Sequence, residues 1–400
     1  MCTYRRPKLN IQLTHLQESA TIKLADRVRH LQSRGRDIIG LQTGDPDFIT
    51  PQPIIDVACS SMKQGMTHYS YSRGLPELRQ AIADKLLQVN GVKYDPDCEI
   101  LVTCGAVHAY YCALKAILNS GDNILVPDPA WMTHVNMLSI TGGQAIRVPS
   151  TIENKFRPTF FEWERAITPQ TIGLVINSPN NPTGSIVTEA YLNDLHHLAQ
   201  VNDLYVISDE VYENIIYNDN KHLCFASLKG AKERTILINS LSKTYAMTGW
   251  RVGYLAAPAH IINEALKVSQ NSITNLPPFI QCAAAFALSD DCIAHTAQQM
   301  VNVYARRRAM VMELFQKNDQ PLFNLFVPQG AFYFFIDARK VAQTSTQLAN
   351  ILLEEASVAL VPGSVFGHCG AGFLRMTIAA SDENIEKGVK AIIQWSQNHE

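Results

Sequence analysis

The sequence predicts an α/β protein built on a mostly parallel sheet, followed by a smaller α+β unit. Between residues 97 and 260, short apolar runs alternate with helical stretches. The runs are continuously apolar and rich in β-branched residues, which is typical of strands covered on both faces. Such alternation implies a mostly parallel sheet with right-handed crossovers. After residue 290 the pattern changes to a long helical stretch and shorter strands.

The predicted elements follow in chain order. A helix at 22–32 precedes the sheet, and another at 189–201 falls between two of its strands. The buried strands are expected at 100–103, 123–126, 173–176, 204–207, 235–238 and 252–255. In the C-terminal part, helical spacing of apolar residues predicts a helix over 292–317, then strands at 331–336 and 373–378 and an amphipathic helix after Ser381. We expect a large domain at 46–290 and a small domain formed by 1–45 and 291–400.

Composition and charge exclude several classes of protein. Of 400 residues, 46% are hydrophobic and 18% charged, and the formal net charge is −2. A globular chain without a basic surplus is not expected to bind nucleic acid or an anionic membrane. Nine scattered cysteines without a CxxC pair favour a reducing, cytosolic compartment, with no metal site or disulfide framework. We expect no membrane span, because no run of about 20 apolar residues occurs.

A lysine is the candidate nucleophile. Lys243 lies in the polar turn after the strand at 235–238, and ligands of open α/β sheets bind beyond the carboxyl ends of strands. A lysine that forms a Schiff base must lose its proton, so it needs burial or neighbouring positive charge. A surface lysine is the alternative for this turn alone. The Gly-Trp-Arg-Val-Gly run around Arg251 favours the functional interpretation.

Two further turns follow buried strands. Asp209 comes directly after the strand at 204–207, where a carboxylate can hold a pyridine nitrogen protonated; a helix N-cap is the alternative. Tyr212 shares its face if the turn is helical. Asn181 lies in Asn-Asn-Pro-Thr-Gly, which is turn chemistry in any protein, and its amide can donate to a phenolic oxygen. The Asn181–Pro182 bond permits a cis peptide.

Three other positions have both a functional and a structural interpretation. The turn at 103–108 opens an apolar helix and presents backbone N–H groups to a phosphate, although such turns are common without a ligand. Trp131 can stack on an aromatic ring or lie in the core. Arg375 is a charge inside an apolar run, and it either clamps a substrate carboxylate or pairs with a structural glutamate. Together, the amine, ring-nitrogen carboxylate, phenol-binding amide and phosphate-binding cation match pyridoxal 5'-phosphate.

Ordered motifs along nearly the whole chain carry a family resemblance. They are Gly44–Phe48, Tyr69–Arg79, Asn180–Gly184, Ser208–Tyr212, Ser240–Lys243, Gly249–Gly253 and Val361–Gly363. The chain resembles the class I and II aminotransferases of the fold-type I pyridoxal-phosphate superfamily, most of all the bacterial aspartate/aromatic subgroup. The resemblance implies a large domain with a mostly parallel seven-stranded sheet and a smaller α+β domain. It also implies a homodimer with shared active sites.

The resemblance also implies residue roles. Lys243 is expected to form the Schiff base and to shuttle the proton. The residues implied to bind the cofactor are Asp209, Asn181, Tyr212, Trp131, Ser240, Ser242, Arg251, Gly105, Ala106, Val107 and, reaching the neighbouring subunit, Tyr69. Those implied to bind the substrate are Arg375, Gly44 and Asn181. Arg73 departs from the family, which often has Ala or Gly there, and we expect it to read a side-chain carboxylate in the partner's site.

The expected reaction is a ping-pong exchange of the amino group between an L-α-amino acid and a 2-oxo acid, in a cytoplasmic enzyme of amino acid metabolism. An aspartate-like or aromatic donor is favoured. Two alternatives stay open from the sequence. The same site could serve a β C–S lyase or an aminocyclopropane-carboxylate-synthase-like enzyme, and a non-enzymatic, aminotransferase-like sensor domain is a further candidate.

Overall fold

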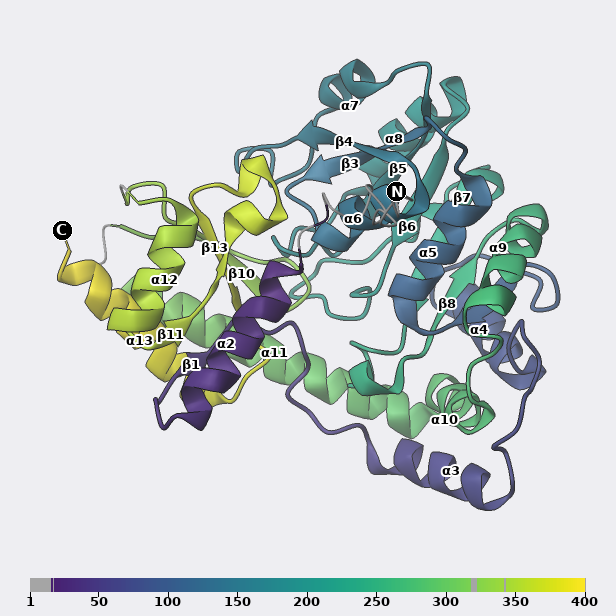
Figure 1. The fold of residues 1–400 in the computed structure, drawn as a ribbon, viewed down its shortest axis with the longest axis horizontal. Coiled ribbons are helices and arrows are strands. Elements are labelled where there is room, and N and C mark those ends of the chain that lie inside the picture. Colours follow the sequence, from purple (N-terminus) through teal and green to yellow (C-terminus); the bar gives the residue numbers. More distant parts are fainter. Residues whose placement is uncertain (1–15, 17, 318–321, 342, 400) are drawn as a thin grey trace, which may run out of the picture.

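The computed structural model describes residues 16, 18–317, 322–341 and 343–399, and its centre is a seven-stranded sheet (Figure 1). The strand order is β2-β8-β7-β6-β5-β3-β4. Every neighbouring pair is parallel except those of β8, which runs antiparallel to β2 and β7. The strands are β2 (Ile100–Thr103), β3 (Asn123–Asp128), β4 (Gln144–Pro149), β5 (Thr171–Asn177), β6 (Tyr205–Asp209), β7 (Thr235–Ser240) and β8 (Gly253–Ala256).

The predicted α/β fold class is confirmed, and each of the six predicted strands is present. The seventh strand, β4, was not predicted from the residues. It lies at the edge of the sheet, and its residues are mostly exposed or half-buried. An edge strand of this kind lacks the continuous apolar run that marks its buried neighbours.

Helices cover both faces of the sheet, which explains the continuous apolar runs. Ile236 and Ile238 of β7 join one core with α5, α6 and α9, whereas Leu237 packs on the opposite face with α3, α4 and α10. The helix α8 closes the rest of that second face. The helices are α3 (Gln52–Lys63), α4 (Pro76–Gln88), α5 (Gly105–Ile117), α6 (Met132–Thr141), α7 (Phe160–Ala166), α8 (Glu189–Val201), α9 (Ala259–Ser272) and α10 (Pro278–Ser289).

A second, smaller sheet lies in the C-terminal part. Its four strands are antiparallel in the order β12-β13-β10-β9, and β1 pairs with β11 beside it. The strands are β1 (Ile39–Gly40), β9 (Asn324–Phe326), β10 (Tyr333–Asp337), β11 (Val358–Ala359), β12 (Val361–Pro362) and β13 (Phe373–Thr377). The helices around them are α2 (Ala20–Ser33), α11 (Asp291–Lys317), α12 (Ser345–Glu355) and α13 (Asp382–Gln397).

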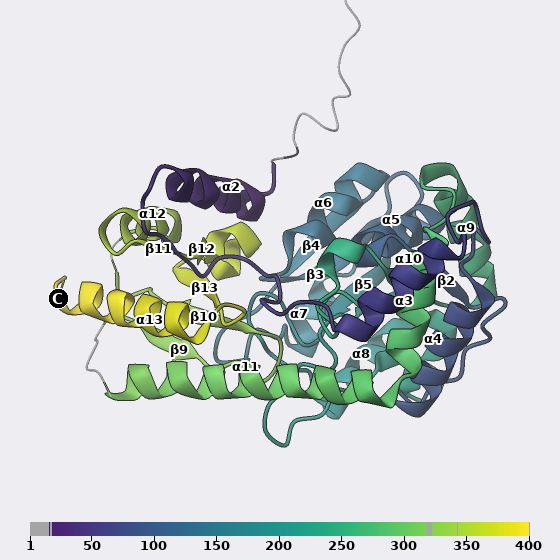
Figure 2. The same ribbon diagram turned by 90° about the horizontal axis from the view of Figure 1, so that it is seen from below.

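The first described helix belongs with the last part of the chain. Figures 1 and 2 show α2 beside α12. Arg27 of α2 donates to Asn350 Oδ1 of α12 at 2.7 Å. We therefore propose the domain division 46–290 against 1–45 with 291–400, of which 1–15, 17, 318–321, 342 and 400 lie outside the described residues.

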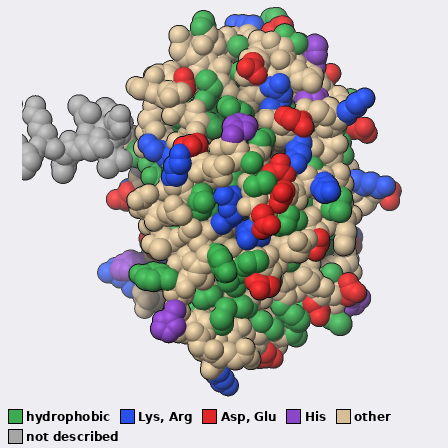
Figure 3. Space-filling view, turned by 90° about the vertical axis from the view of Figure 1, so that its right-hand side faces the viewer, with side chains coloured by type: hydrophobic (Ala, Val, Ile, Leu, Met, Phe, Trp, Pro, Cys, Tyr) green, Lys and Arg blue, Asp and Glu red, His purple; other side chains and the backbone are tan. Residues whose placement is uncertain are grey.

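The charge on one face and the character of the helices are two further features of the fold. Figure 3 shows acidic and basic side chains intermixed on the face at the α4 and α9 end, without a basic stripe there. Among the described helices, none has the length and apolar character needed to cross a membrane. Short 3₁₀ turns at Phe225–Ser227, Lys232–Arg234, Thr248–Trp250, Gly363–Phe366 and His368–Gly370 complete the described elements.

Candidate active site

A cavity opens at the carboxyl edge of the large sheet, where it faces the small sheet. It is lined by the last residues of β5, β6 and β7 and by the turn after β7. The loop before α3 and the helix α2 form the opposite side. Twelve predicted site residues line it: Gly44, Ala106, Val107, Trp131, Asn181, Asp209, Tyr212, Ser240, Ser242, Lys243, Arg251 and Arg375.

Lys243 is a half-buried amine in the wall of the cavity. Its Nζ donates a hydrogen bond to the carbonyl oxygen of Gly44 at 2.7 Å. Burial lowers the pKa of Lys243 to about 8; Asp45 acts against this shift, and the charges of Arg375 and Arg251 add to it. A large fraction of the amine is therefore uncharged near pH 8, as a nucleophilic lysine requires.

Asp209 ends β6 and binds a histidine that the sequence analysis missed. His134 Nε2 lies 2.9 Å from Asp209 Oδ2, and both side chains are buried. Asp209 Oδ1 accepts from the backbone N–H of Val211 at 3.2 Å. No helix begins there, because a turn follows, so the N-cap interpretation is wrong. His134 lies inside an apolar helix, and the one signal for it is its place one helical turn after Trp131.

The amide and phenol groups predicted to bind a phenolic oxygen lie together. Asn181 Oδ1 accepts from Arg375 at 2.9 Å, which leaves the amide N–H groups for a ligand. The Asn181–Pro182 peptide is cis. Tyr212 donates to or accepts from the hydroxyl of Tyr333 at 2.9 Å, and burial raises the pKa of Tyr212 well above its usual value. Both tyrosines therefore stay protonated and can donate at neutral pH.

Arg375 is buried without an acidic partner. Its Nη1 binds Asn181 and its Nη2 donates to the carbonyl oxygen of Gln42 at 2.8 Å. Its Nε has no hydrogen-bond partner among the described residues, and none of those residues forms an ion pair with it. The interpretation as a structural ion pair with a glutamate is therefore wrong. A buried guanidinium with an unused donor suits a carboxylate ligand.

The start of α5 and Arg251 form the opposite end of the cavity. Ala106 and Val107 lie in the first turn of α5, where backbone N–H groups have no intrahelical acceptor. Gly105 precedes them with φ +76°, and a Cβ there would lie 2.6 Å from Arg251 Nη2. Gly105 does not line the cavity; it lets Arg251 approach the helix start. These donors suit a phosphate.

The donor set therefore fits pyridoxal phosphate. Phosphate donors lie at one end of the cavity and the carboxylate of Asp209 lies elsewhere on its wall, and Lys243 lines the same cavity. Trp131 offers a ring for stacking, and the start of α5 is open because residue 105 is glycine.

Besides Gly105, two predicted residues lie outside this cavity. Tyr69 is 88% exposed. Arg73 donates to the carbonyl oxygen of Cys98 at 3.2 Å and to Asn263 Oδ1 at 3.0 Å, so within its own chain it is bound to the outer surface of the large domain. The structure adds four residues of α2 to the lining, which were not predicted: Thr21, Ile22, Ala25 and Arg29.

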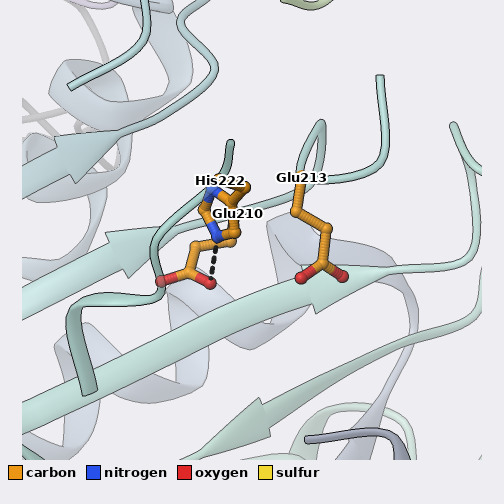
Figure 4. Close-up of side chains that lie close together, drawn as sticks. All are labelled: Glu210, Glu213 and His222. Carbon is orange, nitrogen blue, oxygen red and sulfur yellow. Dashed lines mark hydrogen bonds and ion pairs between the residues drawn. The ribbon is translucent and has the colours of Figure 1, made fainter. Parts of the chain in front are cut away.

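A buried charge network lies behind Asp209 (Figure 4). Glu210, Glu213 and His222 bring their polar atoms within 4.8 Å of one another. His222 Nε2 binds Glu210 Oε2 at 2.8 Å, and Glu213 binds Lys85 and accepts from Asn239 at 2.6 Å. Burial alone would raise the pKa of Glu213, but Lys85 and His222 hold that pKa below its usual value. The carboxylates are thus satisfied by protein donors, as in a structural network.

Comparison with known proteins assigns the family. The model of the aminotransferase class I and II family matches residues 36–392. An aspartate aminotransferase of Pyrococcus abyssi is 42% identical over 354 residues, which are 88% of this chain and 90% of that protein.

Two further relatives agree. The aromatic-amino-acid aminotransferase 2 of Thermococcus litoralis is 36% identical over 95% of this chain and 96% of its own. The solved structure of the Thermus thermophilus aspartate aminotransferase with maleate superposes with a TM-score of 0.92 at 34% identity, over 97% of this chain and 100% of that one. The chain belongs to the class I and II aminotransferases, a family of enzymes that depend on pyridoxal phosphate.

Proposed function

We propose that this enzyme moves the amino group from aspartate or an aromatic L-α-amino acid to a 2-oxo acid by a ping-pong mechanism. The observation that carries the proposal is the pair of Lys243 and Arg375 in one cavity. One is a half-buried amine with a pKa lowered to about 8, and the other is a buried guanidinium without an acidic partner among the described residues. An α-amino acid presents the two matching groups, an amino group on Cα and a carboxylate beside it.

The cofactor residues follow from the donor types. Asp209, oriented by His134, would bind the protonated ring nitrogen. Asn181 and Tyr212 would donate to the phenolic oxygen, and Trp131 would stack on the ring. Ser240, Ser242, Arg251 and the backbone of Ala106 and Val107 would hold the phosphate. When bound, the cofactor supplies an electron sink for the electron pair left on the substrate Cα.

The protein's own groups direct the reaction. Arg375, with the amide of Asn181 and the backbone of Gly44, would fix the α-carboxylate and thereby place Cα near Lys243 Nζ. As a neutral amine, Lys243 would take the proton from Cα and hold it on Nζ as an ammonium, ready to give it up again in the same cavity. The same carboxylate site must accept the incoming 2-oxo acid, because both substrates carry a carboxylate next to the reacting carbon. Because both substrates would use this one site, the first product must leave before the 2-oxo acid enters, and the amino group stays on the enzyme in between, as a ping-pong exchange requires.

The donor class rests on the relatives. Two relatives carry the names aspartate and aromatic-amino-acid aminotransferase, and a third is named a probable aspartate/prephenate aminotransferase. The lyase, synthase-like and sensor-domain alternatives are not favoured by these names.

We further propose a homodimer in a reducing, cytoplasmic compartment. Ile49, Tyr69 and Tyr71 are 83%, 88% and 64% exposed, and a shallow apolar hollow beside Ile49 is lined by Phe48, Trp250, Phe279 and Ile280 among others. Apolar surface of this kind marks protein interfaces. A second copy of the chain would cover it and would bring Tyr69 and Arg73 near the partner's site. All eight cysteines within the described residues are free.

The test is transfer of a labelled amino group. The purified enzyme with pyridoxal phosphate receives ¹⁵N-aspartate or ¹⁵N-phenylalanine and 2-oxoglutarate, and the products are read by mass spectrometry. Label in glutamate, with parallel double-reciprocal plots, is expected. Release of labelled ammonia without any 2-oxo acid would overturn the proposal in favour of lyase chemistry.

A further inference from the structure

The loop that forms one side of the cavity has almost no structure of its own. Residues 42–50 lie in no helix or strand, and within the described parts of the chain they take part in no backbone–backbone hydrogen bond. Yet two carbonyl oxygens of this loop touch the reactive groups. Gln42 accepts from Arg375 at 2.8 Å and Gly44 accepts from Lys243 at 2.7 Å. The position of these carbonyls must therefore come from side-chain contacts.

Contacts with the large domain fix one side of the loop. Thr248 Oγ1 donates to Asp45 Oδ1 at 2.7 Å, and Thr50 Oγ1 donates to the carbonyl oxygen of Ala246 at 2.6 Å. Both partners lie in the turn between Lys243 and Arg251. These bonds place the loop relative to the lysine, but they do not place it relative to Arg375.

Asp47 joins the loop to α11, on the side of the cavity that carries Arg375. Arg307 of α11 binds it through two parallel bonds, Nη1 to Oδ1 at 2.7 Å and Nη2 to Oδ2 at 2.8 Å. Arg307 is only 6% exposed, and its guanidinium carbon lies 5.5 Å from the ring centre of Phe48. A bidentate pair with a buried guanidinium fixes both distance and orientation, although Asp47 itself is partly exposed.

The same guanidinium reaches the strand that carries Arg375. Arg307 Nη1 donates to the carbonyl oxygen of Ile378 at 3.3 Å, and Nε donates to Asp382 Oδ1 at 2.8 Å. Ile378 directly follows β13, three residues after Arg375. One side chain thus bridges the loop at 42–50 and the end of β13, which are the two parts that meet at the carboxylate site.

We propose that Arg307 is a positioning residue for the substrate carboxylate. By bridging Asp47 and the end of β13, it sets the spacing between the loop carbonyls and the Arg375 guanidinium. Arg307 does not line the cavity, so it would act through the loop and β13 rather than on a ligand. The inference rests on the proposed role of Arg375 as the carboxylate-binding residue.

If Arg307 only stabilised the fold, its loss would change different kinetic constants. Loss of a brace lowers the melting temperature and the fraction of active enzyme, which reduces kcat and leaves KM unchanged. Loss of carboxylate positioning weakens binding in the ground state and the transition state alike, which raises KM and leaves kcat nearly unchanged. The split between KM and kcat therefore separates the two roles.

The experiment compares three variants of the holoenzyme. Asp47→Asn weakens the loop contact, and Arg307→Lys removes the fork that makes it bidentate. Asp382→Asn is the matched control, since it weakens another carboxylate contact of the same guanidinium but leaves the loop attached. We expect KM for both the amino donor and the 2-oxo acid to rise by roughly tenfold in the first two variants, with kcat within about threefold and the control within about twofold.

Binding without turnover gives the second readout. Calorimetry measures the dissociation constant of succinate, a dicarboxylate that has no amino group to transfer. We expect it to rise by roughly tenfold in Asp47→Asn and Arg307→Lys. Equal constants in all variants, or an equal rise in Asp382→Asn, would overturn the positioning role while wild-type binding still supports the carboxylate site. A wild-type enzyme that binds no succinate would overturn the carboxylate site itself, and this proposal with it.

Discussion

Two sides of the same cavity are built in different ways. The cofactor side consists of Asp209, Ser240, Ser242, Lys243 and Arg251, which stand at or just after the ends of strands β6 and β7 or before β8. The carboxylate side consists of the loop at 42–50 and Arg375 of β13. Adjacent strands hydrogen-bonded in register fix the first side. The second depends on single side chains that join segments far apart in the sequence, such as Arg307 and Asp47.

The two sides of the cavity therefore depend on different kinds of contact. Removal of a reacting group on the cofactor side should lower kcat. A changed distance on the carboxylate side should instead weaken substrate binding. Substitutions at Lys243, Arg375, Gly105 and Lys85 test this contrast.

Replacing the lysine should have the largest effect. Lys243→Ala removes the group that moves the proton, so kcat should fall by about 10²–10⁴-fold or more. Borohydride reduction should attach the cofactor covalently to wild-type protein and not to the variant, as read by peptide mass spectrometry. Full activity in Lys243→Ala, or covalent attachment at another residue, would contradict the assignment.

Replacing the buried arginine should reduce affinity for carboxylates. Arg375→Gln removes a desolvated charge partner, which costs about 2–5 kcal/mol, or roughly 30-fold to several thousand-fold in kcat/KM. The cofactor should still bind, as read by visible absorption, because Lys243, Asp209, Ser240 and Arg251 would hold it without Arg375. An unchanged KM for both substrates would show that their carboxylates bind elsewhere.

The lowered pKa of Lys243 predicts how the cofactor-free protein captures pyridoxal phosphate. Only the neutral amine attacks, and this form prevails above the pKa of about 8. The capture rate should therefore rise by about tenfold per pH unit below that value and level off above it. Stopped-flow absorption measures the rate. A plateau reached only near pH 10 would mean that Lys243 has the pKa of an exposed lysine.

Two glycines offer a matched pair on the cofactor side. In Gly105→Ala the new Cβ would meet Arg251 Nη2 at 2.6 Å, and the residue would have to keep φ +76°. We expect cofactor affinity to fall by roughly tenfold, since a left-handed alanine alone costs about 1–2 kcal/mol. Gly249→Ala is the control, because nothing lies within 4 Å of its added Cβ. Equal dissociation constants in the two variants would contradict the proposed contact.

The smallest effect on catalysis should come from the charge network behind Asp209. Lys85→Met leaves Glu213 buried without its cation, which costs about 3–5 kcal/mol of folding stability. We expect a lower melting temperature with little change in KM. A changed KM together with an unchanged melting temperature would assign this network to the active site instead.

The same contrast explains what could be read from the sequence. Asp209, Lys243 and the turn at 103–108 each follow a buried strand, and strand ends of a parallel sheet converge. The edge strand β4 was missed because its residues are half-exposed. His134 was missed because it sits inside an apolar helix, where a histidine carries no periodic signal.

Contacts between the two domains could not be predicted from the sequence. The pairing of Arg307 with Asp47 joins residues far apart in the chain, and neither stands in a recognisable motif for the pair. The helix α2 was predicted as an element, yet its place over the cavity depends on packing against α12. The position of Arg73 could not be predicted from the sequence either, because its hydrogen bonds to Cys98 and Asn263 lie outside the cavity.

The central claim is that one cavity binds an amino acid carboxylate at Arg375 and presents its Cα to Lys243. Visible absorption of the holoenzyme during titration with single amino acids tests it most directly. We expect aspartate or an aromatic amino acid alone to convert the absorption band of the bound cofactor. A 2-oxo acid should then restore the band. A band that no amino acid converts, or one that recovers without any 2-oxo acid while pyruvate and ammonia appear, would contradict the central claim.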